Sequence, residues 1–333
     1  MDKGYEPALD GVRALAALAV LTLHAMPQVM LGGYLGVDVF FVLSGYLITS
    51  ILLREVRTSG RIDYARFLTR RARRLFPALA VLIIYLTLFA NLSPALADRR
   101  WFDAAIAALY LTNIRELFWS ADTPLSHTWS LAVEQQFYLL WPFAVLALAR
   151  MTHRAALRTL IVGWIVLTCA RTMAALLWPG WVALCWQTPL HATGLVMGAM
   201  LALTPWRPRR GRSAIGALSL AALLALLLTA SDFRYGFPLA EIAAALLIAS
   251  PPRILAIAPL RWGGAISYGV YLWQLPVLWM LRDQPLALQF AMPILLGAAS
   301  YMLVERRFMP ERAAGARPAG PAPQHEEALP LPS

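Results

Sequence analysis

Long apolar runs make up most of the chain, and short polar intervals separate them. A helix needs roughly 17 to 25 apolar residues to cross a bilayer, and Pro, Gly and Arg clusters set the approximate ends of ten such runs. The runs are 9–27, 36–53, 75–92, 134–149, 157–177, 188–204, 214–230, 238–250, 266–281 and 286–304, with a weaker one at 101–112. The pattern predicts an all-α fold, a polytopic bundle of about ten transmembrane helices.

The composition agrees with this prediction. Of the 333 residues, 59% are hydrophobic and 14% charged, whereas soluble domains have about 45–50% apolar and about 25% charged residues. We expect the first run to remain as a helix, because it has no preceding basic region or A-x-A-like site typical of a cleaved signal peptide. Residues 310–333 are rich in Pro, Ala and Gly, which predicts a disordered cytoplasmic tail after a membrane domain of residues 1–309.

The basic residues predict an orientation in the membrane. A net charge of +11 raises the question of nucleic-acid binding, but Lys and Arg also concentrate in the cytoplasmic loops of membrane proteins. With 101–112 in the interface and ten crossing segments, most of the 29 Lys and Arg fall on one side. If 101–112 crosses, the basic loops at 150–158 and 207–212 fall outside. We therefore predict ten spans with both termini cytoplasmic, and the lipid bilayer rather than nucleic acid as partner.

Arg13 and His24 share one face of the first predicted helix. They are eleven positions apart. At ~100° and ~1.5 Å per residue, their side chains differ by about 20° around the helix and about 16 Å along it. Ionisable side chains inside a membrane are costly and indicate function. The pair could hold the two ends of an elongated ligand, with Arg13 near the inner boundary. Alternatively, His24 forms a hydrogen bond for packing only.

Asp38 begins the second predicted helix from the outer side, at a depth comparable to that of His24. A carboxylate beside an imidazole can fix its tautomer and stabilise the imidazolium. The alternative is an ordinary acidic residue favoured by the helix dipole.

The segment "PLSHTWSLAVEQQFYLLWP", residues 124–142, is the third polar concentration in the membrane region. We expect His127, Trp129 and Glu134 to face the outer zone that also holds His24, which makes them candidates for substrate binding. Trp129 could instead belong to the aromatic belt at the membrane surface.

The basic stretch at 54–79 is typical of an amphipathic interfacial helix, with Phe67 and Leu75 facing lipid. Four Arg stand within five residues, at 70, 71, 73 and 74, which is more than orientation requires. They could bind a polyanionic ligand at the inner face, or anchor the helix on lipid phosphates. Cys169 and Cys185 show no metal-ligand spacing, so no metal site is predicted.

Six motifs together resemble the successive signatures of the acyltransferase 3 family of membrane-bound O-acyltransferases. They are "LDGVRALAALAVLTLHA", "GVDVFFVLSGYLIT", "RRARRLFPAL", "HTWSLAVEQQFYLLWP", "ISYGVYLWQLPV" and "YMLVERRF", running from Leu9 to about Phe308. The resemblance implies transfer of an acyl group, commonly acetyl from acetyl-coenzyme A, to a hydroxyl of a carbohydrate or glycolipid acceptor. It also implies a multi-pass protein of the bacterial inner membrane that modifies cell-envelope polysaccharides.

The resemblance also implies roles for individual residues. By position, the family's essential Arg and His fall on Arg13 and His24, its Asp on Asp38, its Arg-x-x-Arg pair on Arg71 and Arg74, and its late Glu on Glu305. Coenzyme A phosphates would then bind the inner Arg residues, and the thioester would reach His24, acting as general base or as acylated nucleophile. Asp38 would orient His24, and Glu305 would order the Arg cluster through an ion pair with Arg71 or Arg74.

The chain departs from the family pattern at three places. Gln274 stands where many members carry His, and "ERRF" replaces the usual Glu-x-Pro after Glu305. Many relatives append a periplasmic hydrolase-like domain of the SGNH type, so we expect this chain to act alone or with a separate periplasmic partner. Two other functions stay open: a transporter or flippase for a glycan or lipid intermediate, and an interaction subunit without catalysis.

Overall fold

The computed structural model describes residues 6–88, 94–118, 123–177, 184–204, 212–230 and 233–308, and within these ranges every regular element is a helix. This confirms the all-α prediction. The first half contains α1 (Pro7–Ala25), α2 (Leu35–Ser59), α3 (Tyr64–Leu88), α4 (Pro94–Ala108), α5 (Thr112–Phe118), η1 (Ser126–Thr128) and α6 (Trp129–Ala149). The second half contains α7 (His153–Leu177), α9 (Thr188–His191), α10 (Thr193–Leu203), α11 (Arg212–Thr229), α12 (Phe233–Ala249), η2 (Arg253–Ala256), α13 (Ala258–Met280), α14 (Leu286–Ser300), η3 (Tyr301–Glu305) and α15 (Arg306–Phe308).

Five helical segments of the described chain are long and apolar enough to cross a membrane. They are Pro7–Ala25, Leu35–Ser59, Ser126–Ala149, His153–Leu177 and Leu286–Phe308, and three shorter apolar helices accompany them. The protein therefore has the helices of a multi-pass membrane protein. The predicted tail at 310–333 and the first five residues lie outside the described residues.

Two predicted spans are divided in the structure. The run at 188–204 forms α9 and α10, which meet at Ala192. The weaker run at 101–112 is not one helix, because α4 ends at Ala108, α5 begins at Thr112, and Tyr110 between them has a positive φ of 55°.

The predicted interfacial helix at 54–79 is also divided, and this expectation was wrong. Helix α2 continues to Ser59, Gly60 turns the chain with a φ of 70°, and α3 begins at Tyr64. Phe67 and Leu75 do not face lipid; they are buried in the main apolar cluster of the protein. The Arg residues of α3 consequently face a protein interior on one side.

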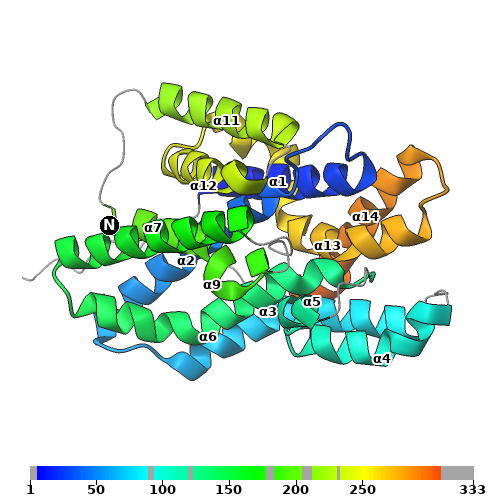
Figure 1. The fold of residues 1–333 in the computed structure, drawn as a ribbon, viewed down its shortest axis with the longest axis horizontal. Coiled ribbons are helices and arrows are strands. Elements are labelled where there is room, and N and C mark those ends of the chain that lie inside the picture. Colours follow the sequence, from blue (N-terminus) through cyan, green and yellow to red (C-terminus); the bar gives the residue numbers. More distant parts are fainter. Residues whose placement is uncertain are drawn as a thin grey trace, which may run out of the picture.

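The axes of the long helices lie side by side and are roughly aligned, with α11 at one edge of the bundle and α4 at the opposite edge (Figure 1). Glycines allow the central helices to approach closely. A Cβ atom at Gly198 of α10 would lie 2.0 Å from the Val42 carbonyl oxygen of α2, and one at Gly264 of α13 would lie 2.0 Å from the Asp10 carbonyl oxygen of α1. Further along both helices, His24 of α1 lies beside Gln274 of α13. Helices α1 and α13 therefore run in the same direction.

Replacing Gly198 by alanine is expected to destabilise the bundle. The new methyl group meets backbone atoms of α2 that cannot rotate away, and overpacking of this kind costs about 1–3 kcal/mol or more. Thermal unfolding of the purified variant in detergent measures the effect. Gly163→Ala on α7 is the matched control, because no atom lies within 4 Å of its Cβ position. Equal unfolding temperatures for the two variants would contradict the close packing of α2 and α10.

Candidate functional site

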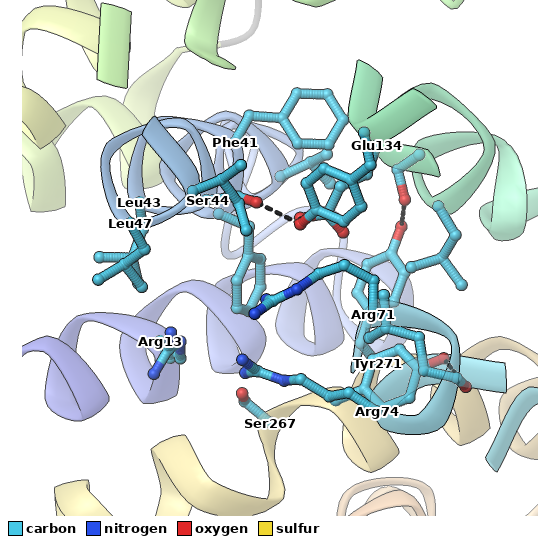
Figure 2. Close-up of a pocket in the computed structure, with 18 of the residues that line it drawn as sticks. Arg13, Phe41, Leu43, Ser44, Leu47, Arg71, Arg74, Glu134, Ser267 and Tyr271 are labelled. Atoms are coloured by element: carbon cyan, nitrogen blue, oxygen red, sulfur yellow. Dashed lines mark hydrogen bonds between the residues drawn. The ribbon is translucent and has the colours of Figure 1, made fainter. Parts of the chain in front are cut away.

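A cavity of about 190 Å³ lies between α1, α2, α3, α6 and α13 (Figure 2). The part of its wall formed by α2 is mainly apolar. The parts formed by α1, α3, α6 and α13 are mainly polar. The polar lining residues are Arg13, Ser44, Arg71, Arg74, Ser130, Glu134, Tyr138, Ser267, Tyr268 and Tyr271. Four of the residues selected from the sequence, Arg13, Arg71, Arg74 and Glu134, therefore face one space.

Three guanidinium groups define one side of this cavity. Figure 2 shows Arg71 and Arg74, from α3, extending toward Arg13 of α1, with Ser267 close by. Arg13 pairs with Asp10 at 2.8 Å, and the buried Nε of Arg71 has no hydrogen bond to a described residue. Arg residues in such a group are suited to phosphate, because the planar guanidinium donates several hydrogen bonds at once. The arrangement can bind a polyanion.

Glu134 lies opposite these Arg residues, on α6. Its Oε1 accepts a 2.5 Å hydrogen bond from the Tyr138 hydroxyl, which in turn is 2.5 Å from the Ser44 hydroxyl. Glu134 is also within electrostatic range of Arg71. The sequence placed Glu134 with His24 in an outer zone; the structure groups it with the Arg residues instead. The reason is that α6 packs along α2 and α3, so Glu134 faces the shared cavity.

His127 connects this cavity to His24. Ser130 and Tyr271 line the cavity, and both donate hydrogen bonds to the His127 carbonyl oxygen, at 3.2 Å and 3.0 Å. The His127 ring is buried, and its Nε2 donates to the Leu272 carbonyl oxygen at 3.0 Å. His24 lies within electrostatic range of this ring. Among the described residues His24 is exposed and does not itself line the cavity.

Asp38 has a different imidazole partner from the one expected. Its fully buried carboxylate lies 3.5 Å from Nε2 of His191, at the end of α9. Nδ1 of His191 lies 3.0 Å from the Cys185 carbonyl oxygen. Both ring nitrogens thus face oxygen acceptors, an arrangement that favours the doubly protonated ring. Close packing of α10 on α2 brings His191 to Asp38, so this pair joins the α9–α10 segment to α2.

Asp38→Ala is expected to lower the stability of the folded protein by about 3–5 kcal/mol, because removal of one partner leaves a buried charge unpaired. Asp283→Ala is the control, since Asp283 pairs with Arg282 on an exposed surface. Thermal unfolding in detergent compares the two variants. If Asp38→Ala keeps its stability and loses only turnover, Asp38 acts on the reaction rather than on the packing of α9.

Trp129 and Glu305 occupy the two flanks of the site. The Trp129 ring is half-buried, stacks on Trp186 at 5.8 Å, and meets the edge of His191 at 4.7 Å. Glu305 is buried, accepts a 3.0 Å hydrogen bond from the Ser300 hydroxyl, and is within electrostatic range of Arg74. Among the described residues it forms no direct ion pair with Arg71 or Arg74.

A second group of buried charges was missed by the sequence analysis. Arg171 of α7 pairs with Glu241 of α12 at 3.2 Å, and Thr193 of α10 donates a 2.5 Å hydrogen bond to the same carboxylate. The indole of Trp164 donates to its other oxygen at 2.6 Å. The signal was available, because Arg171 and Glu241 both fall inside predicted spans, where charges are costly. This network holds α7, α10 and α12 together.

The arrangement places three Arg side chains on one cavity, with the His127 carbonyl at its wall and His24 near the His127 ring. No group of three or more potential metal ligands occurs within the described residues. An all-helical bundle that includes helices of membrane length and encloses a cavity lined by Arg residues defines the class of multi-pass membrane proteins.

The chain belongs to the acyltransferase 3 family. Residues 6–304 match the family described as an acyltransferase domain, which confirms the resemblance seen in the six motifs. The chain is 32% identical to the peptidoglycan O-acetyltransferase OatA of Listeria monocytogenes, covering 91% of this chain and 54% of that protein. It is 35% identical to the putative peptidoglycan O-acetyltransferase YrhL of Bacillus subtilis, covering 82% and 49%, and 32% identical to the O-acetyltransferase OatA of Staphylococcus aureus, covering 82% and 51%.

The chain thus spans about half the length of these curated relatives. No solved structure matches it.

Proposed function

We propose that this protein is an O-acetyltransferase of the bacterial inner membrane that transfers an acetyl group from acetyl-coenzyme A to a hydroxyl of a cell-envelope glycan. The observation that carries the proposal is the cavity in which Arg13, Arg71 and Arg74 converge, in a chain of the acyltransferase 3 family. The named relatives favour peptidoglycan as the acceptor. The proposed topology has about ten spans with both termini cytoplasmic, and a separate periplasmic protein is a proposed partner.

The donor would lie with its charged end at the Arg side of the cavity. The diphosphate and 3′-phosphate of coenzyme A carry several negative charges, and guanidinium groups match them. The pantetheine arm would follow the apolar wall of α2, formed by Phe40, Leu43 and Leu47 among others. Glu305 would hold the Arg side in place through its electrostatic interaction with Arg74.

The chemistry would take place at His24. In direct transfer, the imidazole accepts the proton of the acceptor hydroxyl as its oxygen attacks the thioester carbonyl. In the covalent route, the imidazole itself takes the acetyl group and passes it to the acceptor. His127 and Trp129 would contact the acceptor, and Tyr271 stands where the cavity wall contacts His127.

Proteoliposomes with purified protein test this proposal. Radiolabelled acetyl-coenzyme A and soluble peptidoglycan fragments are supplied, and acetyl esters on the glycan are measured by mass spectrometry. The proposal predicts ester formation that depends on both donor and protein. Transport of unmodified glycan across the bilayer, without acetylation, would favour a flippase instead.

A further inference from the structure

Gln274 is a fully buried amide with hydrogen-bonding capacity left over. It lies in α13 with 0% of its surface exposed, and among the described residues its polar neighbour is the His24 ring. Burying a polar group without enough partners costs about 1–3 kcal/mol by mutational data. Because an amide has two N–H donors and one acceptor oxygen, a single bond to His24 leaves at least one N–H for a ligand.

Gln274 continues the stripe of α13 that lines the cavity. Ser267 and Tyr271 are lining residues, and Gln274 follows them at spacings of seven and three, so it lies on the same helix face. Because α1 runs alongside α13 in the same direction, this stripe ascends beside the face that carries Arg13 and His24. The structure places the Gln274 side chain next to the His24 ring.

We propose that the Gln274 amide N–H groups bind the carbonyl oxygen of the acyl group while His24 acts on the incoming hydroxyl. This inference rests on the proposed function and adds a residue to its mechanism. The ligand group that it assigns to Gln274 is the thioester carbonyl, which fills the amide's free hydrogen-bonding capacity. The Gln274 amide is thus a catalytic group, because it touches a reacting atom.

In direct transfer, His24 carries the proton from the acceptor hydroxyl to the departing thiolate. The acceptor oxygen forms a bond to the carbonyl carbon, its proton passes to His24, and the carbonyl electron pair moves onto the oxygen that the Gln274 N–H groups face. When the carbonyl re-forms, the carbon–sulfur bond breaks, and the coenzyme A thiolate takes the proton from His24. In the covalent route the same oxygen becomes negative, so the role of Gln274 is the same.

A neutral amide is well suited to this place. Donors already aimed at an oxygen that becomes negative stabilise the transition state, and the Gln274 amide is held in the fully buried part of α13. A carboxylate here would repel that charge. The carboxylate expected beside His24, Asp38, instead pairs with His191, which leaves Gln274 as the neutral polar neighbour of the His24 ring.

Gln274→Met removes the donors at similar volume and tests the proposal. We expect kcat to fall by about 10²–10³-fold, as on removal of one oxyanion donor, with the KM for acetyl-coenzyme A within about threefold of wild type. Gln274→His keeps an N–H donor and should recover most of kcat. Gln135→Met is the matched control, because Gln135 is half-buried on α6 and does not line the cavity. A merely structural role would lower the unfolding temperature without this split between kcat and KM.

The outcomes separate this inference from the proposed function. If wild type transfers acetyl and His24→Ala does not, but Gln274→Met keeps its kcat, only the role of Gln274 is overturned. If wild type transfers no acetyl group, the proposed function itself fails. Should Gln274→Met not fold, Gln274→His is compared with Gln274→Glu, which lacks the amide N–H donors. Activity in the first and loss in the second supports the inference, and equal activity overturns it.

Discussion

His24→Ala is expected to abolish acetyl transfer while the protein stays folded and inserted in the membrane. A general base or nucleophile that is removed costs about 10²–10⁴-fold in rate or more, and the two buried imidazoles, His127 and His191, are already held by other partners. His127 uses its Nε2 to donate to the Leu272 carbonyl, and His191 is held between Asp38 and Cys185. Acetyl ester formed per minute in proteoliposomes measures the effect.

His153→Ala is the control for this variant. His153 is an exposed residue at the start of α7 and does not line the cavity, so its replacement should leave transfer unchanged. Gel filtration and thermal unfolding should show both variants equally folded. Wild-type rates in His24→Ala would remove His24 from the reaction.

The double variant Arg71→Ala, Arg74→Ala is expected to weaken donor binding. Each guanidinium is placed to make charge-assisted hydrogen bonds to phosphate, which contribute about 1.5–3 kcal/mol each. Loss of both should raise the apparent Kd for acetyl-coenzyme A by about 10²-fold or more, with a smaller effect on the rate at saturating donor. Titration calorimetry with coenzyme A measures the affinity directly.

Arg73→Ala is the control, because it removes one positive charge from the same turn of α3. Arg73 is exposed and does not line the cavity, so its loss should change affinity little. Equal weakening by Arg73→Ala would indicate general attraction by a basic surface. Unchanged affinity in the double variant would rule out Arg71 and Arg74 as the phosphate site.

Sequence periodicity predicted the helices well because apolar runs of membrane length have few alternative structures. It failed where tertiary packing changed the path of the chain. Gly60 divides the basic stretch into the end of α2 and the start of α3, and the bundle buries Phe67 and Leu75 rather than leaving them in lipid. Hydropathy alone does not distinguish lipid from a protein interior, since both are apolar.

The site was predicted in part for a similar reason. The dense Arg run and the family resemblance indicated Arg71 and Arg74, and the cavity brings these two side chains together with Arg13. The sequence could estimate the depth of Asp38 and Glu134 in the membrane, but it could not choose among neighbours at a similar depth. Those neighbours depend on which helices pack together, and close contacts at glycines such as Gly198 settle that in three dimensions.

The distance from the coenzyme A sulfur to the His24 ring decides whether His24 can act on the thioester. Cryo-electron microscopy of the protein with bound coenzyme A measures this distance. We expect the phosphates on Arg71 and Arg74, the pantetheine arm passing Tyr271, and the sulfur about 3–4 Å from a His24 ring nitrogen, as a reacting geometry requires. If the sulfur ends in the cavity with His127 and Tyr271 closed between it and His24, or if the phosphates lie elsewhere, His24 is not the group that acts on this donor.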